Sequence, residues 1–519
     1  MAALNPGRFT ANQADQSSHS DTRRLGLTLG LAALSGVVFA LALPRGATTQ
    51  GQALSLLVGG LGVGLLAGAI ARSRWALLVA PLIHAVSRLL ALEFLSPHLL
   101  GPTVGALRLD NAYGVLAFLL GYGLYGLLAL MPMVLGASMG VFFARRNLNT
   151  FPASTRNTLR WISPGLAAII LAVLAAWIAL PARTPPILGA DGKTLSGSVA
   201  ELTTVRLGGH DQTIMIRGYS TDKPVLLYLN GGPGMSGLPF TRVVLAELSR
   251  DFVIVDWDQR GTGKSYPAID PTSTLTPAQA VNDTIELTNY LRQRFGEKKI
   301  YLVGVSWGSI LGVLAVQRRP DLYYAFIGSG QMVSVRETDR RVYRDVLALA
   351  ASTNDSKLAA EMRRYGQPPY ADLPYANVFA MDHYDALYKP YTPSQAYREL
   401  GASSGIGPYG IFASEYNLID KFDMLRGLLD MFTVMYPQIQ NIDFRKDVRK
   451  LEVPVYILDG TAELAARRDL TLEWFSSLQA PIKRLVRFDN AAHSVAFEQY
   501  QQFGTLMRGT VLPETYPSR

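Results

Sequence analysis

The stretch "KKIYLVGVSWGSILG" at residues 298–312 decides how the second half of this chain is interpreted. An apolar run typical of a buried strand leads into Gly304-Val-Ser306-Trp-Gly308, and small and apolar residues compatible with a helix follow. A serine hydroxyl becomes a useful nucleophile when a sharp strand-to-helix turn holds it exposed at the top of a sheet. We therefore predict that Ser306 is a nucleophile on such a turn.

The Gly-x-Ser-x-Gly spacing alone does not identify this serine, because the chain contains it twice more. "GASMG" at 136–140 lies within a long apolar segment that indicates a helix, and "GASSG" at 401–405 lies in a polar segment that indicates a loop. Only Ser306 has a strand-like run before it and a helix-like segment after it, so context favours this serine over the other two.

The composition departs from that of an ordinary soluble enzyme. The chain has 519 residues, of which 49% are hydrophobic, and its mean hydropathy is +0.16. Membrane spans, each of about 20 residues, are therefore expected beside a globular domain. The apolar segments that fit lie near 25–43, 53–71, 75–95, 112–143 and 161–180. We interpret the run 112–143 as one long helix bent at Pro132.

The arginines predict how these spans are oriented. With five spans and a cytoplasmic N-terminus, the outer loops hold only Arg45 and Arg108, and the inner segments hold Arg8, Arg23, Arg24, Arg72, Arg74, Arg145, Arg146, Arg156 and Arg160. This distribution satisfies the positive-inside rule. Omitting the segment 75–95 would move the last four of these arginines outside. Five spans are therefore preferred, with the large C-terminal part extracytoplasmic.

Two patterns within the predicted spans admit two interpretations each. Gly60, Gly64 and Gly68 recur at helical spacing, which indicates either close helix packing or only the abundance of glycine in membrane helices. His84 and Arg88 share one helix face, so either they belong to a substrate path or Arg88 pairs with Glu93 near the interface.

Charge and residue types exclude several functions. The net charge of +9 resides largely in arginines near the predicted spans, and no basic surface motif with interleaved aromatic residues accompanies it, so nucleic-acid binding is not expected. The absence of cysteine excludes disulfides and thiolate chemistry. No cluster of ligand residues suggests a metal, and no organic cofactor is expected.

The composition changes after the predicted transmembrane domain, residues 1–183. A linker rich in Pro, Gly and Ser (184–198) is followed by short β-type runs that alternate with helix-like segments such as 277–295 and 310–319. The runs are "TIMIRGY", "PVLLYLN", "FVIVDWD", "KIYLVGV", "YAFIGSG", "VPVYILDG" and "IKRLVRFDN". Such alternation predicts an α/β fold with a mostly parallel sheet covered on both faces.

A long insertion interrupts this alternation. We assign residues 199–330 and 450–519 to the sheet-containing core and 331–449 to a helical cap. The insertion carries Tyr, Met, Phe and Leu at helical spacing, for example at 418–439. An insertion above the strand ends is where the roof of a pocket belongs.

A catalytic serine needs a base, and the base needs an orienting acid. In this sheet architecture they follow in the order serine, acid, histidine. Of the six histidines, only His493 lies late in the chain and directly after the last predicted strand, in "FDNAAHS". The others lie in the N-terminal tail, a span, an outer loop, an early turn and the cap: His19, His84, His98, His210 and His383. We predict His493 as the base.

The acid is expected in the turn after the preceding strand, within "VYILDGTAELAARRD" (455–469). Glu463 is preferred over Asp459, which ends the strand, and over Asp469, which lies further on in a predicted helix. The longer side chain suffices, because the acid must only accept a hydrogen bond from the imidazole and stabilise its charged form.

Two backbone N–H groups should point at the developing oxyanion. One belongs to Trp307, and the glycine-rich turn "LYLNGGPGMSG" (227–237) supplies the other through Gly231 or Gly232. The nearby "DQRGTGKS" (258–265) is not a phosphate loop, because Asp258 stands where that loop requires glycine.

Three ordered motifs carry a family resemblance. "NGGPG" at 230–234, "DWDQRGTGKS" at 256–265 and "GVSWGS" at 304–309 together resemble the proline iminopeptidases and their close relatives among the α/β-hydrolases. The resemblance covers roughly residues 200–519 and excludes the membrane part. It implies a serine hydrolase with a helical cap, with Ser306 as nucleophile and His493 as base.

The sequence departs from the family pattern in the residues that surround the reaction. Asn230 stands where the family usually has histidine, and Glu463 where it usually has aspartate. The family's aminopeptidases bind the free amine with cap carboxylates, for which Glu415 in "FASEYNLID" is the nearest candidate here. The resemblance therefore predicts the reaction class more firmly than the substrate.

These patterns predict a membrane-anchored hydrolase that cleaves an amide or ester through an acyl-enzyme on Ser306. Its partners would be the lipid bilayer and a small substrate. An aminopeptidase that releases N-terminal proline or another small apolar residue is the first expectation. A carboxylesterase or lipase acting near the membrane is the alternative, and a non-catalytic receptor or scaffold is a third.

Overall fold

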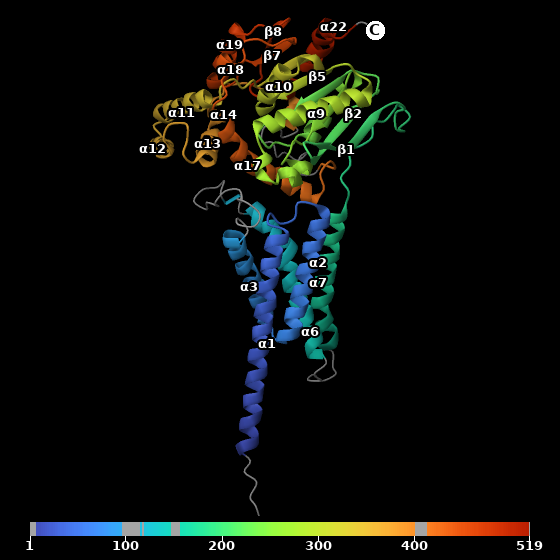
Figure 1. Cartoon of the computed structure of the whole chain (residues 1–519), viewed down its shortest axis with the longest axis vertical. Coiled ribbons are helices and arrows are strands. Elements are labelled where there is room, and N and C mark those ends of the chain that lie inside the picture. The colour runs from blue at the N-terminus through green and yellow to red at the C-terminus, as the bar shows by residue number, and fades with distance from the viewer. Residues whose placement is uncertain (1–6, 96–114, 117–118, 147–155, 400–412, 518–519) are drawn as a thin grey trace, which may run out of the picture. The chain divides into compact units, whose positions relative to one another are not determined.

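The computed structural model describes residues 7–95, 115–116, 119–146, 156–399 and 413–517 (Figure 1). These residues form two compact units, one that ends at residue 180 and one that begins at residue 181. The "GASSG" motif at 401–405 and His98 lie outside the described residues.

The N-terminal unit is helical. Its elements are α1 (Gly7–Ala42), α2 (Gln50–Ala71), α3 (Ala76–Leu90), η1 (Ala91–Leu95), η2 (Leu119–Gly123), η3 (Gly126–Leu130), α6 (Met131–Arg146) and α7 (Arg156–Ala179). Within the described residues, four stretches are long and apolar enough to cross a membrane: Asp21–Ala42, Gln50–Ala71, Ala76–Leu95 and Leu119–Arg145. They match the first four predicted spans. The fifth corresponds to α7, whose apolar described part, Pro164–Ala179, is shorter, so it stays a prediction.

Helix α2 packs backbone against backbone with η3 and α6. A Cβ added to Gly60, Gly64 or Gly68 would collide with the backbone carbonyls of Ala129, Met133 and Ala137, respectively. The approach is reciprocal, because Gly136 and Gly140 of α6 leave no room for a Cβ beside the carbonyls of Leu61 and Leu65. The close-packing interpretation of the glycine spacing is confirmed, and small residues at such an interface allow extensive van der Waals contact.

The expected pairing of Arg88 with Glu93 is wrong. The Arg88 guanidinium is buried and donates to the backbone carbonyls of Leu43 and Pro44, at 3.5 and 3.3 Å. It also stacks over the Tyr125 ring, 3.9 Å from the ring centroid, while Glu93 is exposed. A cation is favoured at this place because the C-terminal end of α1 carries negative partial charge.

His84 is held on both sides within the same unit. Its Nδ1 lies 2.8 Å from the Ser35 hydroxyl and its Nε2 lies 2.7 Å from the Tyr125 hydroxyl. These contacts join α1, α3 and the segment between η2 and η3, so they account for the polar side chains as packing partners.

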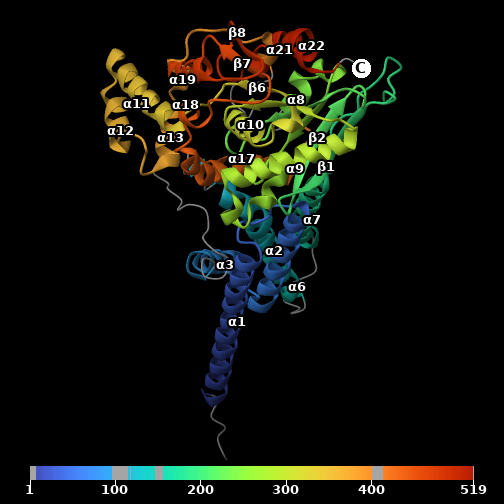
Figure 2. The same cartoon turned by 45° about the horizontal axis from the view of Figure 1, so that its top comes forward.

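The C-terminal unit is built on one eight-stranded sheet (Figure 2). Its strands are β1 (Val199–Leu207), β2 (His210–Gly218), β3 (Val225–Leu229), β4 (Val253–Trp257), β5 (Ile300–Val305), β6 (Tyr323–Ser329), β7 (Val455–Gly460) and β8 (Lys483–Phe488). The order is β1-β2-β4-β3-β5-β6-β7-β8. Only the β1/β2 and β2/β4 pairs are antiparallel, so the predicted mostly parallel sheet is confirmed.

Helices cover both faces of this sheet, and α9 (Pro277–Phe295) and α10 (Trp307–Arg318), which Figure 1 shows, lie on one of them. Alternate residues of β3 enter two separate cores. Val225, Leu227 and Leu229 pack with α9, α10 and α19 (Ala465–Ser477), whereas Leu226 and Tyr228 pack with α8 (Leu238–Val244) and α21 (Tyr500–Leu506). A strand buried on both faces needs apolar residues throughout, which explains the continuous apolar runs.

The ends of α9 follow from its flanking residues. The Thr276 side chain accepts a hydrogen bond from the backbone N–H of Gln279, and Pro277 occupies the first helical position. Gly296 ends the helix with φ 68°, a left-handed conformation that glycine adopts without a steric penalty. These signals explain why the predicted helix 277–295 has the boundaries that the structure gives it.

The insertion between β6 and β7 is helical, as predicted. It contains α11 (Val335–Ser352), α12 (Ser356–Tyr365), α13 (Leu373–Met381), α14 (Tyr384–Leu387), α15 (Gln395–Glu399), α17 (Leu418–Met435), η9 (Tyr436–Ile439) and α18 (Phe444–Asp447). The remaining elements are short: η4 (Leu248–Arg250), η5 (Gly263–Ile269), η6 (Thr272–Thr274), η7 (Pro320–Leu322), α20 (Val495–Glu498), η10 (Met507–Val511) and α22 (Leu512–Thr515).

Candidate active site

Ser306 occupies a tight turn between a strand and a helix. Strand β5 ends at Val305 and α10 begins at Trp307. Ser306 has φ 54° and ψ −119°, a backbone conformation that costs a residue with a side chain roughly 1–3 kcal/mol. Its N–H donates to the carbonyl of Ser329 at 3.1 Å. The half-buried serine thus has the strand-turn-helix context that the sequence predicts.

The two glycines of the motif permit this turn. A Cβ on Gly304 would collide with the carbonyl of Gly308, and a Cβ on Gly308 would collide with the carbonyl of Leu229, the last residue of β3. Glycine at both positions therefore lets the start of α10 lie directly against the strand ends. By contrast, "GASMG" lies within α6, where no such turn exists.

His493 and Glu463 form a close pair. The Nδ1 of His493 lies 2.5 Å from Oε2 of Glu463, and the other oxygen of that carboxylate accepts a hydrogen bond from the Leu464 N–H at 2.8 Å. Burial raises the pKa of Glu463, but the charges of Arg467 and His493 outweigh burial and lower it to about 2. Glu463 is therefore ionised over the physiological pH range and can orient the imidazole.

The end of β6 brings Ser306 and His493 into one place. Ser329 accepts the hydrogen bond from Ser306, and Gly330 follows it with φ 52°. A Cβ on Gly330 would lie 2.8 Å from Nδ1 and 2.9 Å from Cε1 of His493. In the described part of the chain the Ser306 hydroxyl makes no hydrogen bond, and catalytic hydrogen bonds are often long before substrate binds.

The other two candidate acids have different surroundings. Asp459 accepts two hydrogen bonds from Arg468, from Nε at 2.6 Å and from a terminal nitrogen at 2.7 Å. Asp469 lies within α19. Of the three carboxylates considered, the structure brings only Glu463 against His493.

Glu498 supports the histidine loop, and sequence reasoning did not predict this. Its carboxylate accepts hydrogen bonds from the backbone N–H groups of Ala492 and Ser494, the two neighbours of His493. Burial raises its pKa to about 7, against the opposing effect of these hydrogen bonds. Its position in the first helix after the histidine is the only sequence signal that could have drawn attention to it.

The predicted oxyanion donors lie next to Ser306. Trp307 is the first residue of α10, so its N–H has no acceptor within its own helix. A Cβ on Gly231 would lie 3.2 Å from the Ser306 Cβ, and Gly232 follows with φ 111°. Gln259 links both sides, because it donates to the carbonyl of Asn230 at 3.2 Å and accepts from the Trp307 indole at 3.0 Å.

Glu415, the candidate for binding a substrate amine, is completely buried. Its two oxygens accept hydrogen bonds from the Arg242 guanidinium of α8, at 2.5 and 3.5 Å. A buried carboxylate needs such a partner, because an unpaired charge away from water is costly. The sequence could not reveal this pairing, since 173 residues separate the two side chains.

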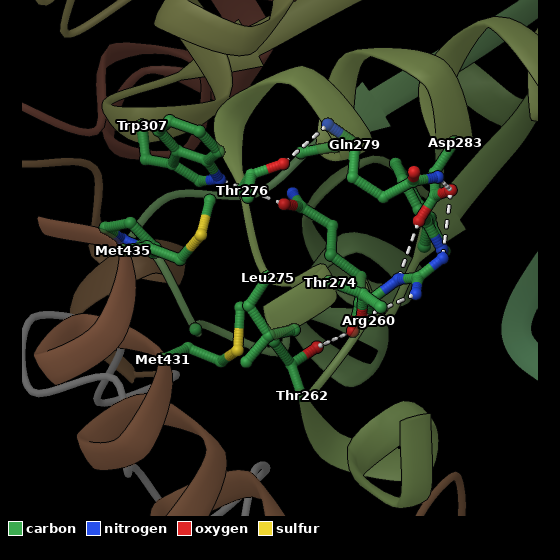
Figure 3. A pocket seen from close by; sticks show the side chains of 15 residues that line it. Arg260, Thr262, Thr274, Leu275, Thr276, Gln279, Asp283, Trp307, Met431 and Met435 are labelled. Carbon is green, nitrogen blue, oxygen red and sulfur yellow. Dashed lines mark hydrogen bonds and ion pairs between the residues drawn. The ribbon is translucent and has the colours of Figure 1, made fainter. Parts of the chain in front are cut away.

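A pocket of about 370 Å³, its open mouth included, lies beside Trp307 (Figure 3). Met431 and Met435 of α17 line it, and the figure shows Met435 near the indole and Met431 near Leu275. The ion pair of Arg260 with Asp283, at 3.0 and 3.2 Å, also lines it. The pocket is thus mainly apolar beside Trp307. Its α17 wall belongs to the insertion in which the sequence predicted a pocket roof, whereas the side formed by Arg260 and Asp283 was not predicted.

The eight-stranded sheet, the serine turn after β5, the acid after β7 and the histidine after β8 together define an α/β-hydrolase. Residues 224–500, more than half of the chain, match the family model described as alpha/beta hydrolase fold, and the chain belongs to this family. The resemblance deduced from the three motifs is thereby confirmed at the level of the family.

Several known proteins are similar to the C-terminal part. A probable aminopeptidase of Bacillus subtilis, YbaC, is 28% identical over 60% of this chain and 96% of its own length. A proline iminopeptidase of Lactobacillus delbrueckii subsp. lactis is 27% identical over 48% of this chain and 78% of its own. A crystal structure of a proline iminopeptidase-related protein from Thermus thermophilus is similar with 20% identity, a TM-score of 0.42, and coverage of 62% and 99%.

Proposed function

We propose that this protein is a membrane-anchored serine hydrolase that cleaves an amide or ester bond through an acyl-enzyme on Ser306. One observation carries the proposal: the strained turn of Ser306 and the pair of His493 with Glu463 both lie against the end of β6. A nucleophile, a base and an orienting acid are the parts that acyl transfer requires.

The proposed reaction gives each residue of the site a role. The Ser306 oxygen attacks the substrate carbonyl while Nε2 of His493 takes the hydroxyl proton. The backbone N–H groups of Trp307 and of Gly231 or Gly232 stabilise the oxyanion. His493 then gives the proton to the leaving group, and a water molecule hydrolyses the acyl-enzyme with the same base. Glu463 stays ionised and stabilises the imidazolium.

We propose an aminopeptidase as the first choice of activity, because the relatives named above include a probable aminopeptidase and proline iminopeptidases. A free substrate amine needs a carboxylate partner. If Glu415 binds that amine, as proposed from the sequence, the Arg242 guanidinium that now holds both of its oxygens has to move.

A carboxylesterase or lipase is the second candidate, and the pocket beside Trp307 favours it. The side chains of Met431 and Met435 give this pocket an apolar wall, which suits an acyl chain better than an ammonium group. An enzyme close to a bilayer would meet substrates that carry acyl chains.

The test compares three substrates on the detergent-purified full chain: a prolyl-arylamide with a free amine, its N-acetylated counterpart and a short-chain ester. The proposal expects hydrolysis of at least one of them by the wild type and none by Ser306→Ala. A requirement for the free amine establishes an aminopeptidase. Ester cleavage without that requirement establishes the second candidate, and no hydrolysis of any substrate contradicts both.

We also propose that the N-terminus is cytoplasmic and the hydrolase unit extracytoplasmic. The support is the arginine distribution described above together with the four long apolar helices. Protease added to intact cells is expected to cleave the hydrolase unit. Cleavage only after permeabilisation would contradict the proposed orientation.

A further inference from the structure

Arg467 is a buried cation at the Nδ1 side of His493. It lies in the first turn of α19, four residues after Glu463. Its terminal nitrogen is 2.6 Å from Nδ1 of His493 and 3.5 Å from Oε1 of Glu463. The guanidinium also lies over the Tyr384 ring at 4.8 Å, and only 6% of the side chain is exposed. The reaction described above gives this residue no role.

The two short contacts of Nδ1 exclude each other as hydrogen bonds. If Nδ1 carries a proton, it donates to Glu463 and offers no lone pair to the guanidinium of Arg467. If Nδ1 accepts from Arg467, the proton sits on Nε2, and the histidine cannot accept the proton of Ser306. The contacts of Nδ1 therefore decide whether His493 is in the tautomer that can act as a base.

We propose that Arg467 is a positioning residue that neutralises Glu463 and disfavours the protonated form of His493, so that the base is available in more acidic solution. This proposal rests on the proposed hydrolysis by Ser306. Arg467 contacts Nδ1 of His493 and the carboxylate of Glu463, and it acts through these two residues.

The charged and titratable groups around His493 come from several elements. Glu463 precedes α19, Glu498 lies in α20, and Tyr384 of α14 and the following Tyr388 interact with Arg467. Burial lowers the pKa of His493, the Arg467 charge lowers it further, and Glu463 acts in the opposite direction. Removal of the positive charge should therefore raise this pKa.

The sign of the effect on activity follows from the role of the base. Only neutral His493 can accept the serine proton, so activity falls as the pH drops through its pKa. A variant without the Arg467 charge should lose activity at a higher pH than the wild type does. A purely structural contribution of Arg467 would lower the rate at every pH and leave the midpoint unchanged.

The experiment follows the rate of fluorophosphonate labelling of Ser306 against pH in the detergent-purified full chain. For Arg467→Met we expect the midpoint of the acid limb to rise by about one pH unit or more, given the short distance of the charge. Arg467→Lys keeps the charge and should shift the midpoint less. Arg468→Met is the matched control, because the guanidinium of Arg468 is engaged by Asp459, and it should keep the wild-type midpoint.

The outcomes separate this inference from the proposed function. A wild type that is not labelled at any pH refutes the proposed function. A labelled wild type together with a labelled Arg467→Met variant that has the same midpoint overturns the role of Arg467. Should Arg467→Met fail to fold, Arg467→Gln carries the same expected shift, and an unchanged midpoint in it overturns the inference equally.

Discussion

Replacement of Ser306 by alanine is expected to abolish fluorophosphonate labelling and to reduce hydrolysis by at least about 10⁴-fold. The reason is local. Ser306 carries the proposed nucleophile on the turn between β5 and α10, and its φ of 54° is that of the strained strand-to-helix turn on which such a hydroxyl is expected. The measurement is kcat/KM on the best substrate of the panel, with labelling of the same preparations.

The chain offers matched controls for this variant. Ser138 is the central serine of "GASMG" in α6, and Ser403 is the central serine of "GASSG". Ser138→Ala and Ser403→Ala should both keep wild-type labelling and turnover. Residual hydrolysis close to the wild-type rate in Ser306→Ala would show that another group is the nucleophile. Loss of labelling in Ser138→Ala instead would show that Ser138, and not Ser306, reacts with the probe.

The central strands could be predicted because burial on both faces forces a continuous apolar run, as in Val225–Leu229. Strand β1 was not predicted. It lies at the edge of the sheet and is only partly buried along most of its length, so polar residues interrupt its pattern. The Gly208-Gly209 turn that leads into β2 was the available signal, since such a pair between two strand-like runs is typical of a hairpin.

The candidate site was predictable where chain order and strand ends determine position. Ser306 and His493 follow β5 and β8, and Glu463 follows β7, so topology alone brings them to one edge of the sheet. The partners of Arg467 and Glu415 were not predictable, because they depend on side chains that approach only after the helices have packed. Sequence spacing does not reveal which charged side chains become buried, and a buried charge needs a partner that only the packed structure shows.

Replacement of Glu463 by glutamine is expected to reduce kcat/KM by about 10³- to 10⁴-fold. The neutral amide no longer stabilises the imidazolium, and its NH₂ group can donate to Nδ1, which favours the tautomer that cannot accept the proton of Ser306. Glutamine is also left beside the full charge of Arg467, 3.5 Å from the present carboxylate, which further disfavours a protonated His493. Because the contacts are otherwise similar in size, the loss should appear in kcat rather than in KM.

Asp459→Asn is the matched control for Glu463→Gln, since Asp459 lies near the end of β7, four residues before Glu463, but is held by Arg468. It should keep a rate within about threefold of the wild type, as substitutions outside the reacting groups usually do. A large loss in Asp459→Asn together with an active Glu463→Gln would assign the acid to Asp459.

The double variant Glu463→Gln with Arg467→Met separates two causes of the loss, the missing carboxylate and the uncompensated charge of Arg467. If the uncompensated arginine contributes to the loss, the double variant should be more active than Glu463→Gln alone on the alkaline plateau, where His493 is neutral in both variants, whereas equal activity there would leave the missing carboxylate as the whole cause.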